Sequence, residues 1–141
     1  MAYSYPRTIH LADTDAAGVV YFSQLLHICH EAYEICLREE GLDWQALLQA
    51  GEMAIPIVHA EINFFQPIKW GDRLTIQLYP SAPDPNKLTV QYQIYPDPIP
   101  ENTTNLLASG QTKHITIQPQ QRQRLPLPNI IKKWVKNAPK M

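Results

Sequence analysis

A short segment near the N-terminus combines carboxylates, a glycine and the start of a helix. Residues 13–22 read Asp13-Thr14-Asp15-Ala16-Ala17-Gly18-Val19-Val20-Tyr21-Phe22, and helical periodicity follows from Ser23. The unpaired N–H groups and the dipole of a helix N-terminus can stabilise a developing negative charge. A carboxylate placed beside them can attack a carbonyl or take a proton from water. The residue types therefore suit acyl transfer, although they also suit a loop with turn and capping carboxylates.

The two carboxylates of this segment need not share one role. Asp13 could approach Asp15 and raise its pKa, since the two residues are only two positions apart. In an extended segment such residues point the same way without touching, and a solvated turn residue is the favoured interpretation of Asp13. Only Asp15 is therefore a catalytic candidate.

Other groupings of reactive residues indicate structural roles. His27, His30, Glu31 and Glu34 could place two or three metal ligands on one helix face, but a solvated or interface-facing polar stripe explains them better, and no metal site is predicted. The two cysteines lie among helical apolar positions and are expected to be buried thiols. The chain also lacks the Gly-x-Ser-x-Gly elbow of serine hydrolases and any glycine-rich phosphate loop.

Two helical segments and an initial strand would position the candidate residues. The segment 4–10 alternates like a strand, and apolar residues at helical spacing predict a long helix over 22–40 that ends at Gly41. An aspartate cap and a glycine stop predict a second, short helix over 43–51.

Four β-like stretches follow the two helices. They cover roughly 55–66, 73–81, 86–96 and 105–118, are rich in β-branched and aromatic residues, and are separated by proline-containing turns. One long helix with a run of antiparallel strands predicts an α+β layer architecture in which a curved sheet wraps the helix. The stretch 88–95 carries more apolar side chains than one face of a sheet is expected to hide.

Length and composition limit the class of protein. A chain of 141 residues fits one domain, 1–141, with a polar C-terminal extension from about 119 and a short amphipathic helix near 129–136. A net charge of −1 argues against nucleic acid as a partner. No apolar run reaches the ~20 residues of a membrane span. The absence of a signal-like N-terminus and the two unbridgeable cysteines predict a cytoplasmic location.

Two stretches of the chain carry a family resemblance. Asp15-Ala16-Ala17-Gly18-Val19-Val20-Tyr21-Phe22 resembles the sequence that leads into the central helix of hotdog-fold acyl-CoA thioesterases of the 4-hydroxybenzoyl-CoA thioesterase family. Ile62-Asn63-Phe64-Phe65-Gln66-Pro67-Ile68-Lys69-Trp70-Gly71-Asp72-Arg73-Leu74 resembles the strand, Gly-Asp turn and next strand of the same family. The resemblance covers the chain from about Tyr3 to Gln118 and leaves the last twenty or so residues outside.

The resemblance implies a site and its chemistry. It places Asp15 on the family's catalytic acid and the Phe22 N–H beside the substrate carbonyl, with Gly18 allowing close backbone approach. Tyr21 and two further residues are candidates for the substrate pocket: Glu31, on the polar side of the long helix, and His59, which shares a strand face with Glu61. His59 and Glu61 could instead edge the subunit interface, which is the favoured interpretation of this pair. Coenzyme A enters only as part of the substrate, so no cofactor is expected.

The resemblance also suggests a substrate and an assembly. Within the family the chain looks most like the hydrolases of an aromatic acyl-CoA, 1,4-dihydroxy-2-naphthoyl-CoA, in phylloquinone and menaquinone synthesis. A short-chain or other acyl-CoA thioesterase, and a non-catalytic acyl-binding hotdog domain, remain alternatives. Because the family forms dimers that often associate further, we expect a homotetramer built from two dimers whose active sites are shared between subunits.

Overall fold

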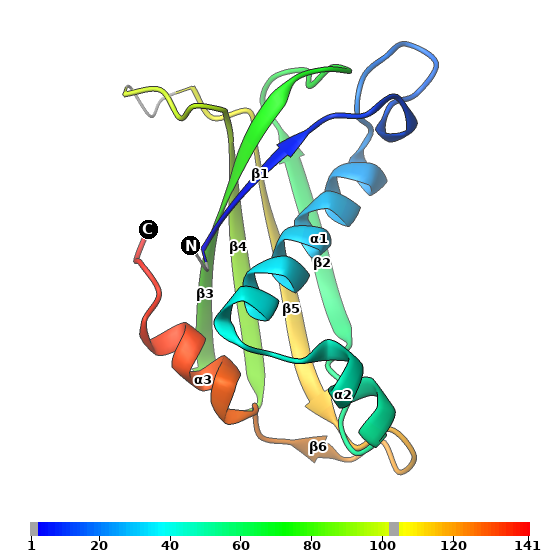
Figure 1. The fold of residues 1–141 in the computed structure, drawn as a ribbon, viewed down its shortest axis with the longest axis vertical. Coiled ribbons are helices and arrows are strands. Elements are labelled where there is room, and N and C mark those ends of the chain that lie inside the picture. Colours follow the sequence, from blue (N-terminus) through cyan, green and yellow to red (C-terminus); the bar gives the residue numbers. More distant parts are fainter. Residues whose placement is uncertain (1–2, 102–104) are drawn as a thin grey trace.

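An antiparallel sheet curves around one long helix (Figure 1). The computed structural model describes residues 3–101 and 105–141. The elements are β1 (Ser4–Thr8), the 3₁₀ turn η1 (Leu11–Asp13), α1 (Phe22–Glu40), α2 (Trp44–Ala50), β2 (Ile57–Phe64), β3 (Arg73–Asp84), β4 (Lys87–Pro96), β5 (Ala108–Ile117), β6 (Arg124–Leu125) and α3 (Asn129–Lys136). The predicted α+β hotdog architecture is confirmed, and the predicted helices and strands lie within a few residues of the observed ones.

The order of the strands leaves two edges on the sheet. The strands run β1-β3-β4-β5-β2, every pair is antiparallel, and the short β6 adds to β5. One edge is therefore the short β1 and the other is β2. Figure 1 shows that the end of β2 and the loop before α1 lie at one end of the molecule, whereas α2 and α3 lie at the other.

The central helix is enclosed over much of its girth, as its broad apolar side predicts. Seven of its residues are buried against the sheet: Leu25, Ile28, Cys29, Ala32, Tyr33, Cys36 and Leu37. The helix ends at Gly41, whose φ of 118° is a left-handed conformation that favours glycine. Hydrophobic burial on this face fixes α1 and thus the direction of its N-terminus.

The concave face of the sheet accounts for the apolar side chains of β4. Leu88, Val90, Tyr92 and Ile94 all lie in the core, and the residues between them are Thr89, Gln91 and Gln93. Alternation therefore hides four apolar side chains of 88–95 on the core face, and the remaining one, Tyr95, lies on the other face, where its hydroxyl donates to Gln93 Oε1 at 2.8 Å.

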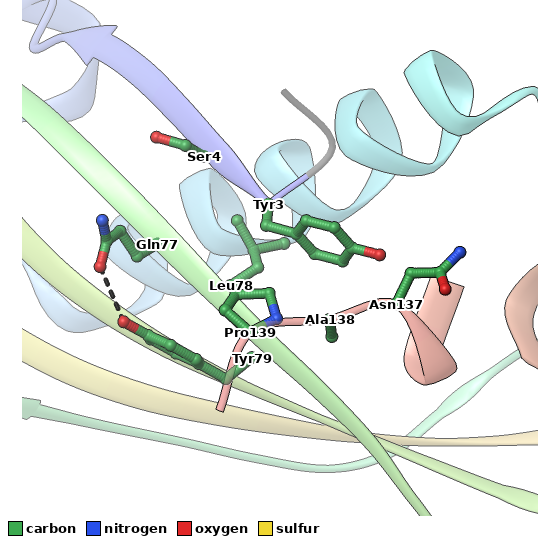
Figure 2. A pocket seen from close by; sticks show the side chains of 8 residues that line it. All are labelled: Tyr3, Ser4, Gln77, Leu78, Tyr79, Asn137, Ala138 and Pro139. Carbon is green, nitrogen blue, oxygen red and sulfur yellow. Dashed lines mark hydrogen bonds between the residues drawn. The ribbon is translucent and has the colours of Figure 1, made fainter. Parts of the chain in front are cut away.

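The C-terminal segment belongs to the same core. Leu127, Ile131 and Trp134 are buried, and Tyr3 stacks on Trp134 and donates a hydrogen bond from its hydroxyl to the Trp134 carbonyl at 2.6 Å. The prediction of a helix over 129–136 is confirmed, but the description of everything after 119 as a polar extension is not, because that helix packs its apolar face inward. The tail after this helix forms a hollow of about 400 Å³ with β1 and β3, and Figure 2 shows the side chains that line it.

Candidate active site

The loop before α1 folds back on itself at Asp15. The Asp15 N–H donates to the Val19 carbonyl, and the Gly18 N–H donates to the Asp15 carbonyl, both at 3.0 Å. Gly18 has a φ of 76°, which a residue with a side chain rarely adopts. The Gly18 carbonyl in turn accepts from the Trp70 N–H at 3.1 Å, so the turn is tied to the segment before β3.

The Asp15 carboxylate is exposed and oriented by backbone donors. Its Oδ1 accepts hydrogen bonds from the N–H groups of Ala17 at 2.8 Å and of Val19 at 3.3 Å. Within residues 3–101 and 105–141, no donor contacts Oδ2. One oxygen thus holds the carboxylate in place while the other is available to a substrate or a water.

The N-terminus of α1 is open a few residues further on. Tyr21 is the N-cap residue and makes no side-chain cap, and Phe22 is the first helical residue. The N–H groups of a first helical turn have no intrahelical acceptor. The side chains of Tyr21 and Phe22 are 44% and 63% exposed. The exposed Asp15 carboxylate thus lies on the turn that leads directly into the uncapped N-terminus of α1.

Asp13 differs from the expectation of a solvated turn residue. It is buried, and its carboxylate forms an ion pair with Arg7 (Nη1–Oδ2, 2.6 Å) and accepts the His10 N–H at 2.8 Å. Burial raises the pKa of the Asp13 carboxyl, but the hydrogen bonds from Arg7 and His10 outweigh it and lower the pKa. The expectation of a solvated Asp13 is wrong because the 3₁₀ turn places this side chain against Arg7, with which it forms an ion pair.

Glu31 shares the same arginine. Its Oε2 accepts from Arg7 Nε at 2.9 Å and from the Tyr5 hydroxyl at 2.5 Å. Burial acts to raise the pKa of Glu31, and the bonds from Arg7 and Tyr5 lower it more. Burial, followed by Glu31, raises the pKa of Tyr5 to about 12. Arg7 is not among the residues predicted for the site, although the alternation of β1 puts Tyr5 and Arg7 on one face.

The candidate His59 lies apart from Asp15 within one subunit. Ile62 packs against Gly110 on the α1 side of the sheet, so His59 and Glu61 project from the opposite face. The two side chains are half exposed and joined by a contact of 3.0 Å between His59 Nε2 and Glu61 Oε1. Any contribution of His59 to the site of Asp15 would have to come from another subunit.

The thiols take the structural role that their positions predict. Cys29 and Cys36 are both buried and unbridged. Burial raises the pKa of Cys29 strongly and that of Cys36 to about 12, which keeps both as thiols at neutral pH. The described part of the chain contains no group of three metal-binding side chains, and none of its helices is long and apolar enough to cross a membrane.

Exposed apolar side chains surround the candidate site. Among residues 3–101 and 105–141, ten large hydrophobic residues are exposed, and six of them belong to the segments around the Asp15 loop and the end of β2: Leu11, Tyr21, Phe22, Phe64, Phe65 and Trp70. Figure 1 shows these segments at one end of the molecule. A soluble monomer rarely gathers apolar groups in this way outside a binding surface.

The fold and the site together define a class of protein. A hotdog domain with a carboxylate turn at the open N-terminus of its central helix has the parts that a thioester hydrolase needs. The sequence profile of the thioesterase-like superfamily matches residues 9–135, and the chain belongs to this family. The match reaches beyond Gln118, so the predicted limit of the resemblance is wrong. The C-terminal helix, with its buried Trp134, lies within the family's domain.

Individual relatives refine the comparison. The chain is 55% identical to a 1,4-dihydroxy-2-naphthoyl-CoA hydrolase of Picosynechococcus sp., over 100% of this chain and 97% of that protein. It is 44% identical to the hydrolase of the same name from Crocosphaera subtropica, over 95% and 96%. Its structure superposes with a TM-score of 0.86 on a 1,4-dihydroxy-2-naphthoyl-CoA thioesterase from Synechocystis, at 39% identity and 96% coverage of each chain.

Proposed function

We propose that this protein hydrolyses 1,4-dihydroxy-2-naphthoyl-CoA to 1,4-dihydroxy-2-naphthoate and coenzyme A, a step of phylloquinone and menaquinone synthesis. The observation that carries the proposal is the exposed Asp15 carboxylate, held by backbone donors on the turn that leads into the uncapped N-terminus of α1. Full-length relatives that act on this aromatic thioester, at up to 55% identity, support the choice of substrate.

Asp15 and the start of α1 divide the chemistry between them. The free Oδ2 of Asp15 either attacks the thioester carbon, giving a mixed anhydride that water then cleaves, or takes a proton from the attacking water. In both routes the C–S bond breaks, one water is consumed, the acyl group leaves as its carboxylate with the Asp15 carboxylate regenerated, and a proton reaches the departing thiolate. The Phe22 N–H stabilises the negative charge on the carbonyl oxygen, a contribution typically worth ~10²-fold or more in rate.

The positive φ of Gly18 keeps the turn short and its surface free of a side chain. An added Cβ there would meet no atom within 4 Å, so the space above the turn is open to the thioester. Coenzyme A is a part of the substrate, and the reaction requires no cofactor. Tyr21, which precedes the oxyanion-binding amide, lines the acyl pocket in this proposal.

The active site is completed by a second subunit. β2 is an edge strand whose residues are almost all exposed, including Ile57, Val58 and Phe64. Antiparallel pairing of two β2 strands about their middle would cover these side chains and satisfy the free backbone groups. The α2 end of one subunit would then lie beside the Asp15 end of the other, bringing His59 of the partner subunit nearer to the site. Two such dimers form the proposed tetramer, in a cytoplasmic enzyme.

A substrate panel with a matched pair of variants tests the proposal. Free thiol release from aromatic and aliphatic acyl-CoAs should favour the dihydroxynaphthoyl thioester, and equal turnover of short aliphatic substrates would favour the alternative thioesterase. Asp15→Asn should lower kcat by on the order of 10³-fold with substrate binding retained, since it removes the charge and keeps the shape. Asp43→Asn is the control, because Asp43 also holds a backbone N–H through Oδ1 but lies at the cap of α2. Undiminished turnover by Asp15→Asn would place the chemistry elsewhere.

A further inference from the structure

Arg7 connects three segments of the protein that are separate in sequence. It projects from β1, and its guanidinium reaches Asp13 at the end of η1 through Nη1–Oδ2 at 2.6 Å and Nη2–Oδ1 at 3.4 Å. Its Nε reaches Glu31 on α1 at 2.9 Å, and Nη1 also donates to the Thr8 carbonyl at 2.7 Å. The side chain of Arg7 is 12% exposed and that of Asp13 is 9% exposed. The planar fork of arginine presents its donors to the two carboxylates in fixed directions, a geometry that the compact ammonium group of lysine does not reproduce.

One of the two carboxylates controls the loop that carries Asp15. Asp13 also accepts the His10 N–H at 2.8 Å and so closes the 3₁₀ turn. Thr14 follows with extended backbone (φ −109°, ψ 160°) and pairs with Val20, and Asp15 comes next. Because Arg7 holds Asp13 in place, it also restricts the position of Asp15, two residues further along the chain.

The other carboxylate belongs to the element that carries the oxyanion donor. Glu31 lies in the same continuous helix as Phe22, so a contact at Glu31 positions the helix start as well. The direct side-chain contact between the loop and the first turn of α1 is longer, at 3.3 Å from Gln24 Nε2 to the Ala12 carbonyl. The charged hydrogen bonds of Arg7 to Asp13 and Glu31 are thus shorter side-chain contacts between the Asp15 loop and α1 than the Gln24 bond.

We propose that Arg7 is a positioning residue for thioester hydrolysis: by binding Asp13 and Glu31 together, it sets the Asp15 carboxylate against the N-terminus of α1. This inference rests on the proposed function for its kinetic consequence. Arg7 itself touches no substrate. Because errors of about 1 Å in the placement of reacting groups can cost ~10²-fold in rate, a misaligned loop lowers the rate even when the fold is intact. Glu31 and Asp13 act through Arg7 in the same way.

A kinetic comparison tests the consequence for catalysis. Arg7→Gln should lower kcat by on the order of 10²-fold with KM changed only a few-fold, and Arg7→Lys by about 10-fold, since lysine keeps the positive charge but not the forked donor geometry. The acid limb of the kcat profile should move to higher pH in Arg7→Gln, because Asp13 and Glu31 lose the cation that keeps them ionised. Leu88→Ala is the control: Leu88 is buried near the opposite end of the sheet, so the variant loses stability and retains kcat.

Amide hydrogen exchange tests the positioning itself, without any substrate. In Arg7→Gln the loop amides that bond within the turn, those of Asp15 and Gly18, should exchange at least 10-fold faster, while the amides between β4 and β5 stay protected. Unchanged exchange in the loop, or a kcat for Arg7→Gln like that of Leu88→Ala, would overturn the inference. If the wild-type protein released no thiol from any acyl-CoA, the proposed function would fail while the exchange result still decided the role of Arg7.

Discussion

Two aspartates that stand two residues apart have opposite environments. Asp13 is buried and shares Arg7 and a backbone N–H, which lower its pKa and commit both of its oxygens to the structure. Asp15 is exposed and commits only Oδ1, to backbone donors. The difference follows from their partners and not from the residue type. It separates the carboxylate that holds the loop from the carboxylate that can react.

A second buried polar group lies in the core, away from this site. His114 on β5 is fully buried, stacks on Tyr33 with ring centroids 4.4 Å apart, and contacts Thr112 Oγ1 through Nε2 at 2.8 Å. Its Nδ1 has no partner among the described residues. Burial, and to a lesser degree His30, lowers the pKa of His114 to about 4.

His114 should therefore make stability depend on pH in mildly acidic solution. The unfolded chain takes up a proton at this histidine below about pH 6.5, and the folded chain does so only near pH 4, so stability is full above pH 6.5 and falls between these values. The free energy of unfolding should fall by roughly 3 kcal/mol over this range. Denaturant titrations at a series of pH values measure this loss. His114→Gln should reduce the dependence of the free energy of unfolding on pH in this range. His27→Gln, at an exposed site on α1, should leave that dependence unchanged. An unchanged slope in His114→Gln would contradict the assignment.

At the scale of elements, the periodicity of the sequence predicts more of the fold than of the contacts. The helix over 22–40, the cap at Asp43 and the alternating strands follow from local patterns, and each is observed. The pairing of Arg7 with Asp13 and Glu31 could not be predicted in the same way. It depends on how β1, the 3₁₀ turn and α1 meet in space, and each of these residues alone resembles an ordinary surface charge.

The glycine in the active-site turn gives a prediction with an internal control. Gly18 and Gly51 have φ values of 76° and 66°, and an added Cβ meets no atom within 4 Å at either one. Alanine should cost about 1 kcal/mol in each case through backbone strain alone. Gly18→Ala should also lower kcat, because the strained turn carries Asp15, while Gly51→Ala at the end of α2 should retain it. Equal kcat values for the two variants would show that the conformation of the Gly18 turn does not affect catalysis.

The C-terminal helix should be essential for stability. Trp134 is fully buried and packs with Tyr3 and Tyr33, so Trp134→Ala should lower the free energy of unfolding by about 3–5 kcal/mol. Lys133→Ala, on the exposed side of the same helix, should change it by less than about 0.5 kcal/mol. Thermal or denaturant unfolding measures both. A small effect of Trp134→Ala would mean that this segment is an appendage after all.

At the scale of the whole molecule, the location of exposed apolar surface connects the site with assembly. The convex face of the sheet carries Gln77, Gln91 and Gln93 together with Tyr79 and Tyr95, whereas the edge strand β2 and the Asp15 loop expose large apolar side chains. The exposed apolar surface is therefore concentrated at the β2 edge and the Asp15 loop. An association that pairs β2 strands would cover the apolar surface and enclose the Asp15 carboxylate in a drier environment, where its interaction with a developing charge is stronger.

Charges placed on β2 should separate the subunits and stop turnover together. Val58 and Phe64 are exposed in one subunit, so Val58→Glu with Phe64→Glu leaves the monomer's core unchanged but places carboxylates in the proposed interface. Light scattering should then report a mass near 16.2 kDa, against about four times that value for the wild type. Circular dichroism should stay native, and kcat should fall by at least 10-fold because each Asp15 loses the surface that covers it. Ala82→Glu places the same charge at an exposed residue of the β3–β4 hairpin, away from β2, and should leave mass and turnover unchanged. A fully active monomer would show that one subunit contains the whole site.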